Sequence, residues 1–240
     1  MADILIGTPI CNEKDYCWDD WSAALKKLKL PEDYERHVVV VDTTPNSMSI
    51  NDKCAREGYN YSNLDKSIKR PMDKVVAARN EIFKAAKACD ADYVLFIDSD
   101  VIVPPDAFLK LKAVLEHPND DDDCGGIASG FYPITTLDGF PIPNAKLHTK
   151  IGWLDLPQTA IDGSAMEVDL VGLGCCLIPR NIFERYLFYC VRDEGQMLKE
   201  AEDMSFCQDI AADGCKIWLD SSVCCRHIMS DAFQWDPDTA

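Results

Sequence analysis

Short apolar runs alternate with helical periodicity along the first half of the chain. Residues 4–8, 38–41 and 93–97 form runs that are almost free of polar side chains. Apolar residues recur every three or four positions after the first run, after Pro71 and after Pro104, and this spacing predicts helices. Uninterrupted apolar strands separated by helices are typical of parallel sheets that are covered on both faces. We therefore predict an α/β fold, with a mostly parallel central sheet flanked by helices on both faces.

The second half of the chain has a less regular pattern. Residues 130–165 are rich in proline, glycine and aromatic residues, which favours a flexible binding loop. Regular elements are predicted beyond this loop: a strand over 171–178, helices from Pro179 and from Glu202, and strands over 216–219 and 223–225. Neither a repeat nor a linker divides the sequence, so we expect one domain.

Polar residues stand where the predicted strands end. Thr8 and Asp42 end the first two runs, and Asp98 and Asp100 follow the third directly. In parallel sheets, ligands bind beyond the carboxyl ends of the strands. Two carboxylates one residue apart lie on the same side of an extended segment, and they repel each other unless a cation offsets their charge. The pair predicts a Mg²⁺ or Mn²⁺ site shared with a substrate diphosphate, with a helix-capping turn as the alternative.

Composition restricts the possible functions. Apolar residues make up 47% of the sequence and charged residues 27%, which excludes wholesale disorder. The balance of basic and acidic residues, 24 − 41 = −17, repels nucleic acid and anionic lipid at long range. The sequence contains no apolar run of roughly 20 residues, and its first residues do not resemble a secretory signal. We therefore expect a cytoplasmic protein without a membrane span.

The cysteines of this chain do not form a recognisable metal motif. None of the twelve pairs with another at the C-x-x-C spacing of zinc ribbons and redox loops. We interpret most of them as small buried hydrophobes in a reducing compartment.

A series of short motifs follows the predicted elements in a fixed order. These motifs are Asn12-Glu13, Val40-Val41-Asp42, Ala78-Arg79-Asn80, residues 93–100 with Pro104-Pro105-Asp106, residues 174–180 with Phe183-Glu184, residues 202–207, Gly214 with Lys216-Ile217, and residues 223–227. In order and spacing they resemble the family 2 glycosyltransferases of the GT-A fold. The resemblance extends from about residue 4 to residue 228.

This resemblance implies a single catalytic domain over residues 1–240. Residues 1–118 would form a nucleotide-binding half, and residues 119–240 an acceptor half that contains the flexible loop at 130–165. The implied reaction moves one sugar from a nucleotide diphosphate donor, in particular a UDP-sugar, to an acceptor hydroxyl, with inversion and with Mn²⁺ or Mg²⁺. The Gln-x-x-Arg-Trp signature of processive synthases is absent from the sequence, so we expect a non-processive enzyme.

Each matching motif residue receives a role from the same resemblance. Asp42 would face the donor base, Arg79 would support the nucleotide, and Asp98 would meet the ribose. Asp203 would act as the general base, and Glu202 would position it or the acceptor. The remaining predicted donor-site residues are Pro9, Asn12, Glu13 and Ser99, and the predicted metal ligands are Asp98, Asp100 and His227.

Two details of this site stay open at the level of sequence. His227 is either a third metal ligand or a buried histidine that hydrogen-bonds the backbone. The choice of nucleotide is open because residues 43–47, with the sequence Thr-Thr-Pro-Asn-Ser, stand where family members often have Asp-Gly-Ser.

Other functions and several acceptors compete with this interpretation. A nucleotidyltransferase of similar fold would also use acids and a metal, and a catalytically silent sugar- or nucleotide-binding module would need no general base. The acceptor could be a glycan, a small molecule or a hydroxymethylated base in DNA. A basic rim for DNA could form from Lys66, Lys69, Arg70 and Lys74.

Overall fold

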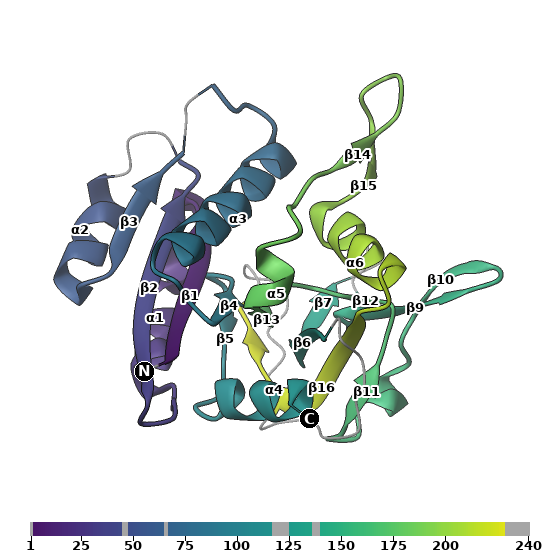
Figure 1. The fold of residues 1–240 in the computed structure, drawn as a ribbon. Coiled ribbons are helices and arrows are strands. Elements are labelled where there is room, and N and C mark those ends of the chain that lie inside the picture. Colours follow the sequence, from purple (N-terminus) through teal and green to yellow (C-terminus); the bar gives the residue numbers. More distant parts are fainter. Residues whose placement is uncertain (1, 45–47, 65–66, 117–124, 136–139, 229–240) are drawn as a thin grey trace.

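A computed structural model describes residues 2–44, 48–64, 67–116, 125–135 and 140–228, which fold around one eight-stranded sheet (Figure 1). In spatial order its strands are β11 (Ala165–Glu167), β16 (Lys216–Cys224), β6 (Gly126–Phe131), β13 (Cys175–Pro179), β4 (Tyr93–Ile97), β1 (Ala2–Ile10), β2 (Tyr34–Asp42) and β3 (Asn60–Asn63). Strands β4, β1, β2 and β3 are mutually parallel, as are β6 and β16. Strand β13 runs antiparallel to β4 and β6, and β11 antiparallel to β16.

Alternate residues of the parallel strands point to opposite faces of this sheet, and each face has its own layer of helices. Ile4 and Ile6 of β1 pack in one core cluster, and Leu5 packs in the other. The first cluster includes α1 (Trp18–Lys27), α2 (Met48–Glu57) and α4 (Ala107–Leu115), and the second includes α3 (Pro71–Ala88), α5 (Arg180–Phe183) and α6 (Glu202–Ala212). The predicted α/β architecture with helices on both faces is therefore confirmed.

Residues 130–165 are not the loop that the sequence predicts. Their described part contains short antiparallel strands: β7 (Pro133–Thr135) pairs with β8 (Pro141–Pro143), and β9 (Ala145–Thr149) with β10 (Gly152–Asp155). Further along, β9 also pairs with β12 (Leu170–Val171), and η2 (Gln158–Ala160) precedes β11. Prolines are tolerated in β7 and β8 because each strand has a single partner. Phe131 and Tyr132 are buried core residues.

Two other predicted elements change at their boundaries. The strand predicted over 171–178 is divided into β12 and β13, because Gly172 and Gly174 lie against the Tyr132 hydroxyl instead of pairing in the sheet. The strands predicted over 216–219 and 223–225 form one strand, β16, whose register with β6 shifts between Asp220 and Cys224. The sequence analysis did not predict α2, β3 or β6.

Short strand pairs complete the described chain around the carboxyl ends of the sheet. Strand β14 (Val191–Arg192) pairs with β15 (Leu198–Glu200), and β5 (Val101–Ile102) pairs with β17 (Arg226–His227). The 3₁₀ helix η1 (Asn12–Cys17) follows β1 directly. Ile10 is in register with Asp42, so β1 and β2 end side by side. Polar strand-end residues of distant parts of the sequence are thereby gathered at one edge.

In the described part of the chain, ten cysteines form no disulfide, and six of these are buried. The interpretation of most cysteines as small buried residues agrees with this burial, whereas Cys215 is disulfide-bonded. None of the helices in the described part of the chain is both long enough and apolar enough for a membrane crossing.

Candidate active site

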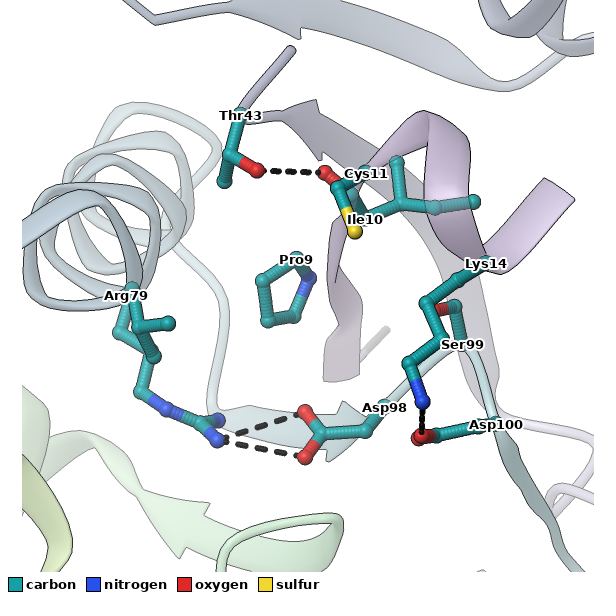
Figure 2. A pocket seen from close by; sticks show the side chains of 10 residues that line it. Pro9, Ile10, Cys11, Lys14, Thr43, Arg79, Asp98, Ser99 and Asp100 are labelled. Atoms are coloured by element: carbon teal, nitrogen blue, oxygen red, sulfur yellow. Dashed lines mark hydrogen bonds and ion pairs between the residues drawn. The ribbon is translucent and has the colours of Figure 1, made fainter. Parts of the chain in front are cut away.

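A cavity of about 160 Å³ opens at the carboxyl ends of β1 and β4 (Figure 2). Its wall includes several residues that the sequence predicts for the donor and metal sites, namely Pro9, Arg79, Asp98, Ser99 and Asp100. Thr8 lies two residues before the end of β1 and stabilises the sheet: its hydroxyl is buried and donates to the Ile97 carbonyl over 2.7 Å. We call this space the donor cavity.

A second cavity of about 270 Å³ shares Arg79 and Asp98 with the first, so the two spaces adjoin. Glu202 and Asp203 line this second cavity at the start of α6. The two predicted catalytic acids therefore lie beside Asp98, although Asp98 comes about a hundred positions before them in the sequence. We call this space the acceptor cavity.

Arg79 stands between the two cavities. Its Nη2 lies 3.3 Å and 3.4 Å from the two carboxylate oxygens of Asp98, and its Nε lies 3.3 Å from Glu202 Oε1. The guanidinium also covers the ring of Phe96, 5.0 Å from its centroid. The side chain is only 5% exposed, and its Nη1 has no hydrogen-bond partner among the described residues. Arg79 is thus the counter-ion of acids in both cavities, and one of its N–H groups is left to form a hydrogen bond with a ligand.

Asp98 and Asp100 have opposite electrostatic environments. Burial raises the pKa of the Asp98 carboxyl, and Arg79 only partly opposes this effect. Burial also acts against ionisation of Asp100, but hydrogen bonds from His227 and Lys14 outweigh it and lower the Asp100 pKa to about 2. Asp100 is therefore held as a carboxylate between the Lys14 ammonium and the His227 imidazole.

His227 reaches Asp100 because β17 pairs with β5 directly beyond the acid pair. His227 is in register with Val101, and its Nε2 lies 3.5 Å from Asp100 Oδ2. Its Nδ1 lies 2.9 Å from the Pro133 carbonyl oxygen, which can only accept, so Nδ1 carries a proton. The structure thus combines both interpretations of this histidine: one ring nitrogen bonds the backbone, and the other faces a predicted metal ligand.

The two acids of the acceptor cavity occupy the first turn of α6. Glu202 is buried beside Arg79, whereas Asp203 accepts a hydrogen bond from the Met204 amide over 2.8 Å. Burial raises the pKa of Asp203, and the Met204 hydrogen bond and the charge of Arg79 act in the opposite direction. A carboxylate with a raised pKa is a better proton acceptor than an exposed one.

Comparison with known proteins identifies the family. The family profile described as glycosyl transferase family 2 matches residues 5–186. The chain belongs to glycosyl transferase family 2. This membership makes it a glycosyltransferase, and it decides against the nucleotidyltransferase alternative.

Solved structures agree with the fold of this glycosyltransferase. A mannosyltransferase from Pyrobaculum calidifontis, PcManGT in complex with GDP-Man and Mn²⁺, gives a TM-score of 0.62 at 15% identity, covering 96% of this chain and 58% of that one. S. aureus TarS 1-349 in complex with UDP gives 0.58 at 18% identity, covering 98% and 59%. A protein from STIV gives 0.51 at 16% identity, covering 100% and 92%. No curated protein matches the chain in sequence.

The glycosyltransferase thus spans less than two thirds of the TarS and PcManGT chains but nearly all of the STIV protein. At these identities the likeness establishes the GT-A fold alone.

Some predicted donor-site residues do not line either cavity. Asp42 is fully buried at the end of β2, where it accepts hydrogen bonds from the Thr44 amide at 2.8 Å and the Tyr61 hydroxyl at 3.1 Å. Glu13 is exposed on η1, outside both cavity walls. The Asn12 side chain, residues 45–47 and Lys66 lie outside the described part of the chain, and the roles given to these residues stay predictions.

Several lining residues were missed by the sequence analysis. Lys14 lines the donor cavity, and Asn144 and Lys146 line the acceptor cavity. Lys14 directly follows the Asn12-Glu13 motif, which was a usable signal. The structural role of Asn80 in the Ala78-Arg79-Asn80 motif was also not predicted. Its amide exchanges two hydrogen bonds of 2.9 Å with the backbone of residue 188 and ties α3 to the segment before β14.

The residues around Asp100 fit a divalent cation. Two carboxylates and an imidazole nitrogen are ligands that Mn²⁺ accepts readily, and the ammonium of Lys14 already marks a cation position on Asp100 Oδ2. In this structure the side chains around Asp100 are not yet arranged as a compact ligand set. Among the described residues, the three side chains whose potential ligand atoms lie within 4.8 Å of one another are Asp3, Glu35 and His37, near the amino-terminal ends of β1 and β2. Binding an ion at Asp100 therefore requires Asp98 and Lys14 to change partners.

Proposed function

We propose that this glycosyltransferase is an inverting, metal-dependent, non-processive enzyme that moves one sugar from a nucleotide diphosphate donor to an acceptor hydroxyl. The observation that supports this function best is the shared wall of the two cavities. Arg79 and Asp98 belong to both, the predicted metal-binding acid Asp100 lines one, and the predicted base Asp203 lines the other.

The donor would occupy the cavity at the ends of β1 and β4. Its diphosphate would lie near Asp100, with Arg79 Nη1 available to a phosphate oxygen and Asp98 near the ribose. TarS with UDP-GlcNAc and PcManGT with GDP-Man share the fold, which supports a nucleotide sugar as the class of donor. We take a UDP-sugar as the first donor to test.

Asp100, Asp98 and His227 would hold the ion, Mn²⁺ or Mg²⁺. When bound, the ion neutralises the charge that develops on the leaving diphosphate. The imidazole of His227 is already oriented for this role, because its Nδ1 proton is bound to the Pro133 carbonyl and its Nε2 faces Asp100.

Asp203 would take the proton of the acceptor hydroxyl, and Glu202, held by Arg79, would keep the first turn of α6 in place. The acceptor would approach from its own cavity, while the diphosphate leaves into the donor cavity on the other side of Arg79 and Asp98. Attack from the side opposite the leaving group in a single displacement inverts the anomeric carbon.

The acceptor cavity admits only part of a large acceptor. Its volume of about 270 Å³ suits a sugar ring, a small molecule or one extruded base. Met72 lies in the same segment as the predicted basic rim and lines this cavity, whereas Lys69, Arg70 and Lys74 are not among its lining residues. Transfer assays with an oligosaccharide, a monosaccharide and a 5-hydroxymethylated duplex distinguish the acceptors.

The test of the donor site combines a panel of nucleotide sugars with Asp100→Asn. In thermal melts, the matching donor raises the melting temperature of the unchanged protein only when Mn²⁺ is present, because the ligand binds the native state alone. Asp100→Asn abolishes this Mn²⁺-dependent shift, because a neutral amide holds the ion weakly.

The matched control is Asp106→Asn, a change in an acid of the same segment that pairs with Lys110 outside the cavities. It keeps the full shift. Unchanged Mn²⁺-dependent donor affinity in Asp100→Asn would remove Asp100 from the metal site.

A further inference from the structure

Asp100 already binds a cation of the chain itself. The ammonium of Lys14, on η1, lies 2.7 Å from Asp100 Oδ2 (Figure 2). The same oxygen faces His227 Nε2 at 3.5 Å. The Asp100 side chain is 15% exposed and that of Lys14 is 38% exposed, so the pair is partly shielded from water. Lys14 therefore occupies the Asp100 oxygen that also faces His227, the other proposed metal ligand at this position.

Lys14 and a divalent cation cannot both hold this oxygen closely. Each is a compact positive charge, and two such charges on one carboxylate oxygen repel each other strongly where water is partly excluded. The lysine stem is flexible and starts from a 3₁₀ helix that is partly open to solvent, so the ammonium can turn away without moving a strand.

Once turned away, the ammonium stays within the donor cavity. Lys14 is part of its wall, together with Pro9, Ser99 and Asp100. A bound diphosphate adds negative charge to this space, and phosphate oxygens are good acceptors for a lysine ammonium. The same side chain thus has one partner before the donor arrives and a different partner after it.

We propose that Lys14 exchanges partners during donor binding: it neutralises Asp100 in the empty site and binds the donor diphosphate once a divalent cation takes its place. This inference rests on the proposed function and adds a donor-binding residue to it. Lys14 then weakens binding of the metal alone and strengthens binding of the nucleotide to the metal-loaded protein. The binding free energies of the metal and of the nucleotide therefore become more strongly coupled than they would be through direct contact between the metal and the diphosphate alone.

The test uses the neutral variants Lys14→Met and Lys14→Gln. Electron paramagnetic resonance of free Mn²⁺ measures binding of the ion alone, and calorimetry measures binding of UDP at saturating Mn²⁺. In both variants we expect Mn²⁺ to bind at least about fivefold more tightly and UDP at least about fivefold more weakly, at the lower end of couplings between sites.

Lys53→Met is the matched control. Lys53 pairs with Asp15 of η1 over 2.7 Å, so its replacement removes a lysine charge from the same neighbourhood but outside the cavity. It leaves both affinities unchanged, and circular dichroism melts verify that every variant folds.

Opposite changes in the two affinities support the exchange, because a merely structural role of Lys14 would weaken both. Unchanged or jointly weakened affinities overturn it. A third outcome is that UDP binds the unchanged protein equally well with and without Mn²⁺ and that the Lys14 variants lose this binding. Lys14 then replaces the ion permanently. The exchange is wrong in that case, although a transferase function stands. If the unchanged protein binds neither Mn²⁺ nor any nucleotide, both the exchange and the proposed donor site are overturned.

Discussion

Asp98, Asp100 and Asp203 show how the same carboxyl group acquires different properties from its surroundings. Burial raises the pKa of Asp98 and of Asp203, whereas cationic partners hold Asp100 ionised. An acid that stays charged suits a cation, and an acid whose charged form is disfavoured suits a proton acceptor. The environments of Asp100 and Asp203 therefore agree with the roles that we propose for them, whereas Asp98, which lines both cavities, is buried like Asp203.

Asp203→Asn tests this division directly. The amide keeps the shape and can still accept the Met204 hydrogen bond, but it cannot take a proton. We expect turnover to fall at least ~10²-fold with unchanged donor affinity. Asp209→Asn, on the same helix and bonded to the Tyr189 hydroxyl, serves as the control with normal turnover. Near-normal turnover of the Asp203 variant would exclude Asp203 as the base.

The same variant has a second readout in stability. Because the folded-state pKa of Asp203 is raised, its protonated form stabilises the native state at low pH, and this contribution is lost as the pH rises through the folded-state pKa. Asparagine does not titrate. The variant should therefore gain stability over the unchanged protein between about pH 4 and neutrality, as measured by urea unfolding at a series of pH values. A gain that does not change with pH would contradict the raised pKa.

At the scale of elements, three consecutive residues of α3 have different roles in packing and in the candidate site. In the Ala78-Arg79-Asn80 motif, Ala78 is buried in the core, Arg79 joins the two cavities, and Asn80 binds the backbone of residue 188. The helix can bring Arg79 to the strand ends only because it lies very close to β1. Gly7 allows this approach, since a Cβ there would lie 2.2 Å from Ile82 Cγ2.

Gly7→Ala should therefore push α3 away from β1. We expect a loss of ~1–3 kcal/mol in the free energy of unfolding, the usual cost of overpacking. In an Ile82→Leu background the loss should shrink, because leucine lacks the Cγ2 methyl that the new Cβ meets. Denaturant unfolding of the four proteins in this double-mutant cycle measures the coupling. Equal losses in both backgrounds would show that Ile82 is not the obstacle.

At the scale of the whole molecule, cations are concentrated in the site of an acidic protein. The formal net charge is −17, yet the donor cavity is lined by Arg79 and Lys14, and His227 approaches it at Asp100. Asp98 and Asp100 balance these two cationic side chains in the same lining, so an anionic donor meets a neutral cavity rather than an acidic one, and salt screens the excess negative charge of the surface.

The excess negative charge also predicts how salt changes stability. Raising ionic strength from 0.01 M to 0.15 M shortens the screening length from about 30 Å to about 8 Å and weakens repulsion among surface acids. The melting temperature in sodium chloride should rise over this range. A falling melting temperature would mean that attractive ion pairs outweigh the repulsion.

Residues 93–97 illustrate what local pattern predicts well. The apolar run forms β4 with the same ends, and its carboxyl end places Asp98 and Asp100 at the donor cavity. The sequence analysis did not predict β6, and it treated residues 130–165 as a loop, because short strands with many glycines or prolines lack a periodic signal. Their strands exist through pairing with distant partners, which propensity does not report.

The sequence alone determined the alternating strands and helices, the acid pair after β4 and the motifs of the family, since each depends on neighbours along the chain. Only the tertiary structure decided that Arg79 links Asp98 to Glu202, that His227 and Lys14 meet at Asp100, and that Asp42 is enclosed by hydrogen bonds. These contacts join residues up to 127 positions apart, 227 − 100 = 127. They form because burial of the two cores brings the strand ends together, a cooperative effect that no short stretch of sequence contains.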